Sequence, residues 1–341
     1  MADMRHCLFG VLCLLAASAA GAELPDLPAG AETKIEDPSI GGNGYYLVYV
    51  PSDYTPDRTW PLVVCYHGLN GKVTTWPFKN VLGGKRCIVV GMEYYERGSG
   101  GSGGSRDVEN VKRILPPLVK KLKVDTEQLF IGGFSKGGFT TNRIAGQTLS
   151  LWAGILILGA GGSGPGGPGS CKGKAVYVGV GETDGFRESA ESAVASYKRL
   201  GAKVTFEIYK GRGHAVDAKS EVMRDWFLAN TEFRTVEPAI AASEELVKRK
   251  KLGLAYKTLK EAAAMSDTFG LCQEAARQAQ ALAEAFEKRF AEAEQAAANK
   301  QVPRAATILR VLVREFAGCD LAERAKKRIP ELTAEAKGES Q

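Results

Sequence analysis

The sequence places a serine where it can act as a nucleophile. Ser135 lies in Gly133-Phe134-Ser135-Lys136-Gly137, directly after the apolar run Leu129–Ile131. A sharp strand-to-helix turn needs small neighbours, and it presents the serine hydroxyl above the end of a sheet. The structural alternative is a glycine turn that lets a helix pack closely on a strand. We predict that Ser135 is a nucleophile.

A serine hydroxyl attacks only when a base takes its proton and an acid orients that base. The chain has three histidines, and His6 lies in an N-terminal segment that we expect to be removed. His214 follows the predicted strand Val204–Tyr209, as expected for a base carried on a loop at the strand ends. His67 lies in a glycine-bordered turn, for which we favour a structural role. His214 is therefore the predicted base, and an ordinary surface loop histidine is the alternative.

Two carboxylates follow the apolar run Ala175–Val180 and could orient His214. Asp184 is preferred because its shorter side chain would fix the imidazole more rigidly. Glu182 is the other candidate, and it would point away on an extended segment. The structural alternative for Asp184 is a cap on the helix expected from Arg187.

Developing negative charge on the substrate oxygen also needs donors. The backbone N–H groups of Lys136 and Leu69 are the predicted oxyanion donors. Trp76 and Phe134 are candidates for the substrate pocket, although core packing accounts equally well for Trp76. The glycine-rich stretch Gly98–Ser105 lacks the spacing of a phosphate-binding loop, and we expect a mobile loop near the site.

The elements that must position these residues alternate between short apolar runs and amphipathic stretches. One predicted helix is capped by Asp107, and another runs from near Arg187 to Gly201. Continuous apolar strands separated by helices indicate an α/β fold, with a mostly parallel sheet covered on both faces. The predicted strands are Tyr45–Val50, Leu62–Tyr66, Cys87–Met92, Leu129–Phe134, Ile155–Leu158, Ala175–Val180 and Val204–Tyr209.

Composition divides the chain into three parts. Residues 1–22 combine Arg5, an apolar run and small residues, as in a secretory signal peptide, and an uncleaved anchor is the alternative. Glycine is frequent in residues 23–235, whereas residues 236–341 are rich in alanine and show no strand pattern. Leu259 and Ala275 recur fifty positions later as Leu309 and Ala325, so helical hairpins of the tetratricopeptide class and a single helical bundle are both open.

The net charge of +6 is small for 341 residues, so no nucleic-acid partner is expected. After removal of the signal the cysteines are odd in number and lack CxxC spacing. Neither a metal site nor a disulfide framework is indicated, although one disulfide is possible. No cofactor is expected either. The cysteines are Cys65, Cys87, Cys171, Cys272 and Cys319.

The chain order Ser135, Asp184, His214 is that of α/β-hydrolases. Over about residues 40 to 230 the sequence resembles polyhydroxybutyrate depolymerase-like and feruloyl-esterase-like hydrolases, on the segments Pro61–Val64, His67-Gly68, Gly132–Gly138 and Gly211–His214. The resemblance implies a serine esterase that forms an acyl-enzyme and uses no metal. The segment Gly159–Ser170 leaves no room for a lid domain, which suits bulky or polymeric esters.

We therefore predict a secreted or periplasmic serine hydrolase of carboxylic esters, with a helical C-terminal region that binds a protein partner or self-associates. Lys136 departs from the small or apolar residue usual after the nucleophile, although its N–H remains suitable. Two alternatives remain, a peptidase on the same fold and a non-catalytic scaffold with a relic hydrolase domain.

Overall fold

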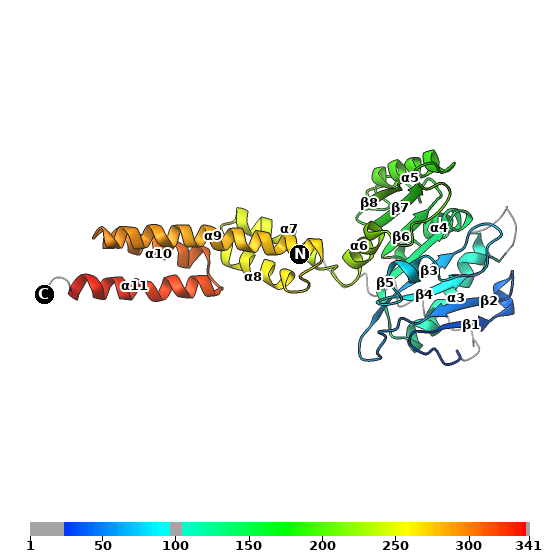
Figure 1. The fold of residues 1–341 in the computed structure, drawn as a ribbon, viewed down its shortest axis with the longest axis horizontal. Helices are drawn as coiled ribbons and strands as arrows, with labels where there is room; N and C mark the ends of the chain where they lie inside the picture. Colours follow the sequence, from blue (N-terminus) through cyan, green and yellow to red (C-terminus); the bar gives the residue numbers. More distant parts are fainter. Residues whose placement is uncertain (1–23, 96–103, 339–341) are drawn as a thin grey trace. The chain divides into compact units, whose positions relative to one another are not determined.

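The computed structural model describes residues 24–95 and 104–338 of the chain. It divides into two compact units that separate between Thr231 and Glu232 (Figure 1). The sequence placed this boundary after residue 235. The predicted signal peptide, residues 1–22, and most of the predicted mobile loop, Gly98–Ser105, lie outside the described residues.

The first unit is built on an eight-stranded sheet in the order β1-β2-β4-β3-β5-β6-β7-β8. β2 runs antiparallel to both β1 and β4, and the strands from β4 through β3 to β8 are parallel. The strands are β1 (Glu32–Glu36), β2 (Tyr45–Tyr49), β3 (Trp60–Tyr66), β4 (Ile88–Met92), β5 (Val124–Phe134), β6 (Gly154–Leu158), β7 (Ala175–Gly181) and β8 (Lys203–Tyr209). The predicted mostly parallel α/β sheet is confirmed.

Alternate residues of the central strands enter two separate cores. On β3, Leu62 and Val64 pack into one core, whereas Val63 and Cys65 pack into the other. Burial on both faces explains why the strand reads as a continuous apolar run without polar alternation.

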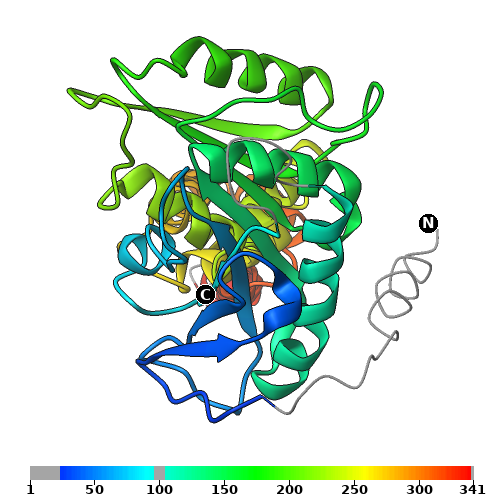
Figure 2. The same ribbon diagram turned by 90° about the vertical axis from the view of Figure 1, so that its right-hand side faces the viewer.

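Helices cover both faces of the sheet (Figure 2). The core that contains Leu62 and Val64 also contains side chains of α3 (Ser105–Lys121), α4 (Lys136–Gln147) and α5 (Arg187–Arg199). The opposite core contains side chains of α2 (Phe78–Val81) and α6 (Glu221–Asn230). Two short 3-10 turns, η1 (Pro38–Ile40) and η2 (Leu149–Leu151), complete the unit.

The predicted cap of α3 is wrong. The helix begins at Ser105 with Gly104 at its N-cap, so Asp107 lies inside the first turn. Its buried carboxylate accepts a hydrogen bond from the Tyr95 N–H at 2.8 Å. The acidic side chain thus joins the end of β4 to the start of α3.

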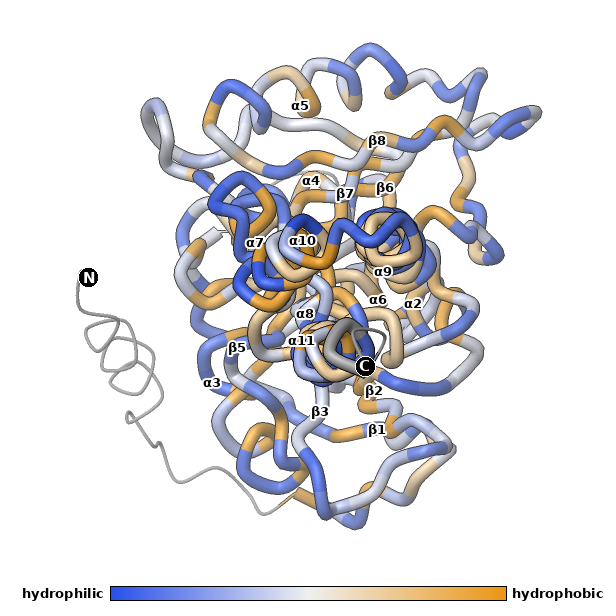
Figure 3. Tube along the Cα trace, turned by 90° about the vertical axis from the view of Figure 1, so that its left-hand side faces the viewer, coloured by the Kyte–Doolittle hydropathy of each residue, from blue (hydrophilic) through white to orange (hydrophobic). Residues whose placement is uncertain are grey.

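The second unit is all helical, with helix α7 (Val236–Lys248), α8 (Leu252–Ala263), α9 (Gly270–Ala298), α10 (Val302–Glu315) and α11 (Asp320–Gly338). Its helices mix hydrophobic and hydrophilic residues along their length (Figure 3). α9 packs against α7 and α8 and also against α10 and α11. Its second half contributes Phe286 and Phe290 to a core that also holds Leu309 of α10 and Ala325 of α11. One long helix therefore belongs to both halves of the unit.

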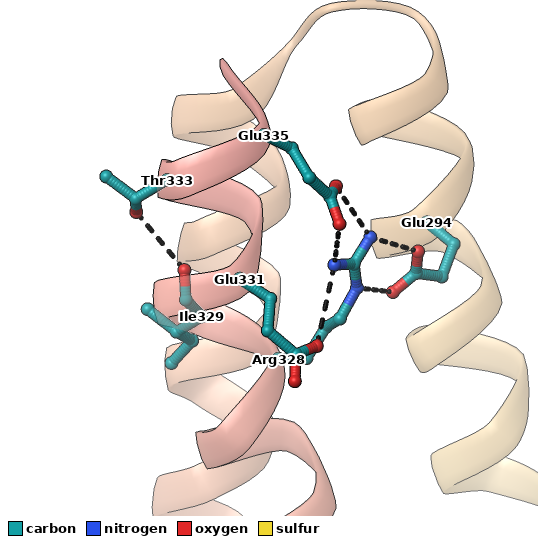
Figure 4. A network of polar contacts seen from close by, with 6 residues as sticks. All are labelled: Glu294, Arg328, Ile329, Glu331, Thr333 and Glu335. Atoms are coloured by element: carbon teal, nitrogen blue, oxygen red, sulfur yellow. Dashed lines mark hydrogen bonds and ion pairs between the residues drawn. The ribbon is translucent and has the colours of Figure 1, made fainter. Parts of the chain in front are cut away.

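An ionic cluster joins α11 to α9 (Figure 4). The Arg328 guanidinium donates to both carboxylate oxygens of Glu294, at 2.9 and 3.1 Å, and to both oxygens of Glu335, at 2.6 and 3.0 Å. Glu331 lies 3.6 Å from the same guanidinium. Only Glu294 lies on the other helix, and its bidentate pair with Arg328 adds geometric specificity to the packing of α11 on α9.

Candidate active site

The turn between β5 and α4 holds Ser135 in a conformation that few residues adopt. Ser135 has φ 56° and ψ −121°, and it is the N-cap of α4. The flanking glycines leave no space for a side chain. A Cβ at Gly133 would lie 2.5 Å from the Gly137 backbone, and a Cβ at Gly137 would lie 2.2 Å from the Tyr66 carbonyl oxygen. The glycine pattern is therefore a steric requirement of this sharp turn, and backbone strain at such a position is typical of functional sites.

Ser135, His214 and Asp184 form one hydrogen-bonded chain. His214 Nε2 lies 2.8 Å from Ser135 Oγ, and His214 Nδ1 lies 3.0 and 2.9 Å from the two carboxylate oxygens of Asp184. Because a carboxylate can only accept, Nδ1 carries the proton and Nε2 is left as the acceptor for the serine hydroxyl. The three loops that carry these residues follow β5, β7 and β8, which are parallel and end at the same edge of the sheet.

A second contact, besides that with His214, holds the Asp184 carboxylate in place. Its carboxylate is fully buried, and one oxygen accepts a hydrogen bond from the Phe186 N–H at 2.9 Å. The aspartate thus braces the chain ahead of α5, close to the capping role considered for it, while it also faces His214. A buried carboxylate held by two donors can orient the imidazole and stabilise its protonated form.

Glu182 takes a different place from Asp184. Its carboxylate accepts a hydrogen bond from the Gly211 N–H at 2.9 Å, and its backbone N–H donates to the Tyr209 carbonyl at 3.1 Å. Glu182 therefore ties the loop after β7 to the loop that carries His214. Glu182 is the alternative candidate for the orienting acid, and its carboxylate binds the backbone of the His214 loop.

The predicted oxyanion loop runs beside Ser135. A Cβ at Gly68 would lie 3.6 Å from the Ser135 Cβ, so Leu69 follows a residue that is close to Ser135. His67 at the start of the loop is buried, with Nδ1 2.7 Å from the Gly68 carbonyl and Nε2 3.2 Å from Glu93 Oε1. Tyr94 donates its hydroxyl hydrogen to the His67 carbonyl. These contacts hold the loop in place, which fits the structural role predicted for His67.

Lys136 is the first residue of α4, so its N–H is at the helix N-terminus next to Ser135. Its amine lies over the Tyr94 ring, 4.1 Å from the centroid. Burial lowers the pKa of Lys136, and the negative charges of Asp107 and Glu93 partly oppose that shift. The Lys136 side chain therefore packs against Tyr94, whose hydroxyl group donates to the His67 carbonyl in the predicted oxyanion loop.

Aromatic side chains surround His214. Phe134 and Phe186 pack on its ring, with centroids 4.8 and 5.2 Å away. Trp76 meets Phe134 edge to face at 6.1 Å and is 36% exposed. Phe186 is 40% exposed and Leu69 is 47% exposed, so the rim of the site presents large apolar groups to solvent.

Phe186 was not among the predicted site residues. It precedes a helix in the loop that carries Asp184, and an apolar residue at such a position was the one available signal. In the described ranges, 24–95 and 104–338, no cluster of three His, Cys, Asp or Glu side chains is arranged to hold a metal. The five cysteines from Cys65 to Cys319 are all free thiols.

No protein-family model matches the chain. A bifunctional acetylxylan esterase/xylanase of Neocallimastix patriciarum is 28% identical over 109 residues, which are 29% of this chain and 15% of that protein. The chain thus spans less than a sixth of that relative's length.

Several solved esterase structures are similar to this chain. The feruloyl esterase module from Clostridium thermocellum is 17% identical with a TM-score of 0.44, over 62% of this chain and 90% of the module. A hyperthermophilic esterase from Pyrobaculum calidifontis is 17% identical with a TM-score of 0.46, over 67% and 92%. An acetyl xylan esterase from Aspergillus awamori is 14% identical with a TM-score of 0.45, over 58% and 98%.

The first unit has the α/β-hydrolase fold. Its mostly parallel sheet is flanked by helices on both faces, and Ser135 stands at the sharp turn between β5 and α4.

Proposed function

We propose that the protein is an exported serine hydrolase that cleaves carboxylic esters through an acyl-enzyme intermediate. The observation that carries the proposal is the hydrogen-bonded chain from Ser135 Oγ through His214 to the buried Asp184 carboxylate. Two further features support it. The strained turn at Ser135 presents the serine hydroxyl group at the end of the sheet, and the glycine loop beside it offers backbone N–H groups for the oxyanion.

In acylation, Ser135 Oγ attacks the ester carbonyl carbon while His214 Nε2 takes the hydroxyl proton. The carbonyl oxygen becomes an oxyanion, for which the N–H groups of Lys136 and Leu69 are the proposed donors. When the tetrahedral intermediate collapses, the bond to the alcohol oxygen breaks and His214 returns the proton to that oxygen.

Deacylation repeats the sequence with water. His214 takes a proton from water as the water oxygen attacks the acyl carbon, and it then protonates Ser135 Oγ as the ester bond to serine breaks. Asp184 stabilises the imidazolium in both halves and is not itself protonated.

The apolar rim favours esters with bulky groups, including esters attached to a polymer. Trp76 and Phe186 are large, partly exposed and linked through Phe134 and His214 to the nucleophile. Aromatic surface held against the reacting group contributes binding energy through burial. We therefore assign Trp76, Phe134 and Phe186 to substrate binding.

For export we propose that residues 1–22 are a cleaved signal and that the mature chain is secreted or periplasmic, as the sequence indicates. Within the described residues, no helix is long and apolar enough to cross a bilayer. N-terminal sequencing of protein recovered outside the cytoplasm tests this, and a retained Met1 would contradict it.

For the second unit we propose a tandem helical repeat in preference to a single bundle. Leu259, Leu309, Ala275 and Ala325 are all buried, in agreement with the fifty-residue offset of the sequence. Association with another chain is the predicted role of this unit. Sedimentation of the mature chain over a concentration series tests self-association, and a monomer at every concentration would exclude it.

A fluorophosphonate probe tests the nucleophile, because it reacts only with an activated serine. The mature chain should label, and Ser135→Ala should abolish labelling while the thermal transition stays within a few degrees. A folded wild-type chain that never labels would defeat the hydrolase proposal and favour the scaffold alternative.

An ester panel tests the reaction and the rim. Turnover of p-nitrophenyl acetate and feruloyl esters should exceed that of peptide anilides, and faster anilide turnover would identify a peptidase. Phe186→Ala should raise KM for bulky esters by at least about tenfold, since burial of a large side chain is worth about 1.5–3 kcal/mol, and should affect acetate esters little. Met265→Ala removes a similarly exposed apolar residue from the other unit and is the matched control.

A further inference from the structure

The turn between α7 and α8 carries four consecutive basic residues, Lys248 to Lys251, and all four are exposed. Lys248 pairs with Glu245 at 2.6 Å. In the part of the chain that the structure describes, no side-chain hydrogen bond or ion pair engages Arg249, Lys250 or Lys251. The pKa of Glu245 is lowered by the hydrogen bond from Lys248 and by its charge, and the positive charge of Arg249 adds to this effect. Three cations thus extend from one tight turn.

The turn between α9 and α10 has the same backbone fifty residues later. Lys250 and Lys300 both have positive φ, 56° and 58°. Lys251 at φ −96° and ψ 57° matches Gln301 at φ −92° and ψ 51°. Backbone hydrogen bonds match as well. The Lys250 N–H donates to the Val247 carbonyl at 2.9 Å, and the Lys300 N–H donates to the Ala297 carbonyl at 2.8 Å.

The side chains of the two turns differ sharply. Where the first turn has Arg249 and Lys251, the second has Asn299 and Gln301. Because the second turn folds identically without these charges, the backbone does not require them. Residues 248–251 carry four positive charges, whereas residues 298–301 carry one.

Two large apolar side chains adjacent to the cationic turn in the sequence are exposed, and one of them, Leu254, has its Cδ2 3.7 Å from where a Cβ on Gly318 would lie. Val247 is 39% exposed and Leu254 is 45% exposed. Their counterparts in the second turn are the smaller Ala297 and the charged Arg304. The first turn therefore combines several cations with exposed apolar groups, whereas the second turn keeps one cation, Lys300, and has Ala297 and Arg304 at the two apolar positions.

We propose that the α7–α8 turn is a contact site for an anionic lipid surface. Arg249, Lys250 and Lys251 bind the phosphate groups, and each cation near such a surface contributes about 1 kcal/mol. Val247 and Leu254 bury apolar surface at the headgroup boundary. A polyanion such as nucleic acid or heparin would be bound through the charges alone, and an arginine in place of Leu254 would bind it more tightly. The lipid surface accounts for both features.

Vesicle cosedimentation tests the site on the chain from residue 23 onward, which removes the apolar leader as a source of binding. Vesicles of phosphatidylcholine with about 30% phosphatidylglycerol should bind the chain, and pure phosphatidylcholine should not. Binding should weaken as salt rises.

The variant Arg249→Asn with Lys251→Gln installs the residues of the second turn, so its fold is expected to be retained. Loss of two cations should weaken vesicle binding roughly 25-fold. Lys326→Gln with Lys327→Gln removes the same charge from α11 and is the matched control, for which we expect a change of less than about threefold, because these lysines lie outside the α7–α8 turn.

A third variant, Val247→Ala with Leu254→Ala, keeps every charge. It should weaken vesicle binding and leave elution from heparin–agarose unchanged. Equal losses for the two charge variants would overturn the site, since net charge alone would then be responsible. Retention on heparin without any binding to anionic vesicles would overturn the lipid assignment in favour of a polyanion.

Discussion

Replacing Asp184 by asparagine tests the role of the carboxylate alone, because the rest of the site should stay unchanged. The asparagine Oδ1 can still accept from the Phe186 N–H, which Asp184 does at 2.9 Å, so the loop should keep its conformation. Toward His214 the amide can present its NH₂ group, which favours a proton on Nε2 in place of Nδ1. Nε2 would then face Ser135 Oγ, 2.8 Å away, as a donor and could not accept the serine proton.

The loss should be about 10³- to 10⁴-fold in kcat/KM, as expected for the wrong tautomer and an unstabilised imidazolium. In free energy this is about 4–5.5 kcal/mol of transition-state stabilisation. The assay is hydrolysis of p-nitrophenyl acetate at pH 7, with the rate of fluorophosphonate labelling as a second readout. Glu182→Gln is the matched control. It retains an acceptor for the Gly211 N–H and should stay within about tenfold of the unaltered chain, since hydrogen bonds of this kind contribute about 1 kcal/mol.

Two results would refute the reasoning. One is Asp184→Asn activity within tenfold of the unaltered chain. The other is an equal loss for Glu182→Gln, which would make the two carboxylates equivalent. Both variants should keep the thermal transition within a few degrees, so that a loss of activity is not a loss of fold.

Three further predictions concern the scaffold. Gly137→Ala places a Cβ 2.2 Å from a backbone carbonyl oxygen and should destabilise the first unit by more than about 3 kcal/mol in thermal or urea unfolding, whereas Gly167→Ala, with no atom within 4 Å, should be nearly neutral. Burial raises the pKa of four thiols, those of Cys65, Cys87, Cys171 and Cys272. In the native chain from residue 23, only Cys319 should therefore react quickly with a thiol-specific reagent, and all five thiols should react after unfolding. Fast reaction of several thiols in the native chain would contradict the buried core. Arg328→Met should lower the transition of the second unit by about 3 °C at pH 7. The hydrogen bonds from Arg328 lower the pKa of Glu335 below its ordinary value of 4.5, so the stabilisation is present above that pH and is lost as the pH falls through the lowered pKa. The difference between variant and parent should therefore shrink as the pH is lowered below 4.5, and a constant difference would contradict the ionic account.

Most strands of the first unit and the turn at Ser135 could be predicted from the sequence, because apolar runs and glycines determine the local backbone there. β3, β4, β6, β7 and the second half of β5 were recognised because apolar runs buried on both faces need no alternation. The partly exposed β8 was recognised by its valine, isoleucine and aromatic residues, and the glycines around Ser135 signalled the sharp turn. β1 was not predicted, because this edge strand buries only Ile35 among exposed and partly exposed neighbours and gives almost no apolar signal. β5 extends back to Val124 through polar residues, where pairing of Trp60 with Val124 overrides local preference.

The site was predictable in its residue types and less so in its contacts. Chain order and strand ends indicated Ser135, Asp184 and His214, which the structure brings together. The choice between Asp184 and Glu182 rested on side-chain length, whereas the decisive fact is the direction of each carboxylate. The contact of Phe186 with His214 depends on how the loop after β7 folds over the sheet edge, and sequence spacing carries no information about it.

The shared helix α9 has a consequence for how the second unit opens. A helix of 29 residues is about 43 Å long, and α9 packs against both the α7–α8 half and the α10–α11 half. Neither half can lose its packing without exposing part of the same helix, so fluctuations should spread from one half to the other instead of ending at a linker. The amides in the middle of α9 should therefore exchange with solvent only when the whole unit opens, and those at the outer ends of α7 and α11 should exchange first. Because both halves pack on α9, we expect the second unit to unfold as a single cooperative unit.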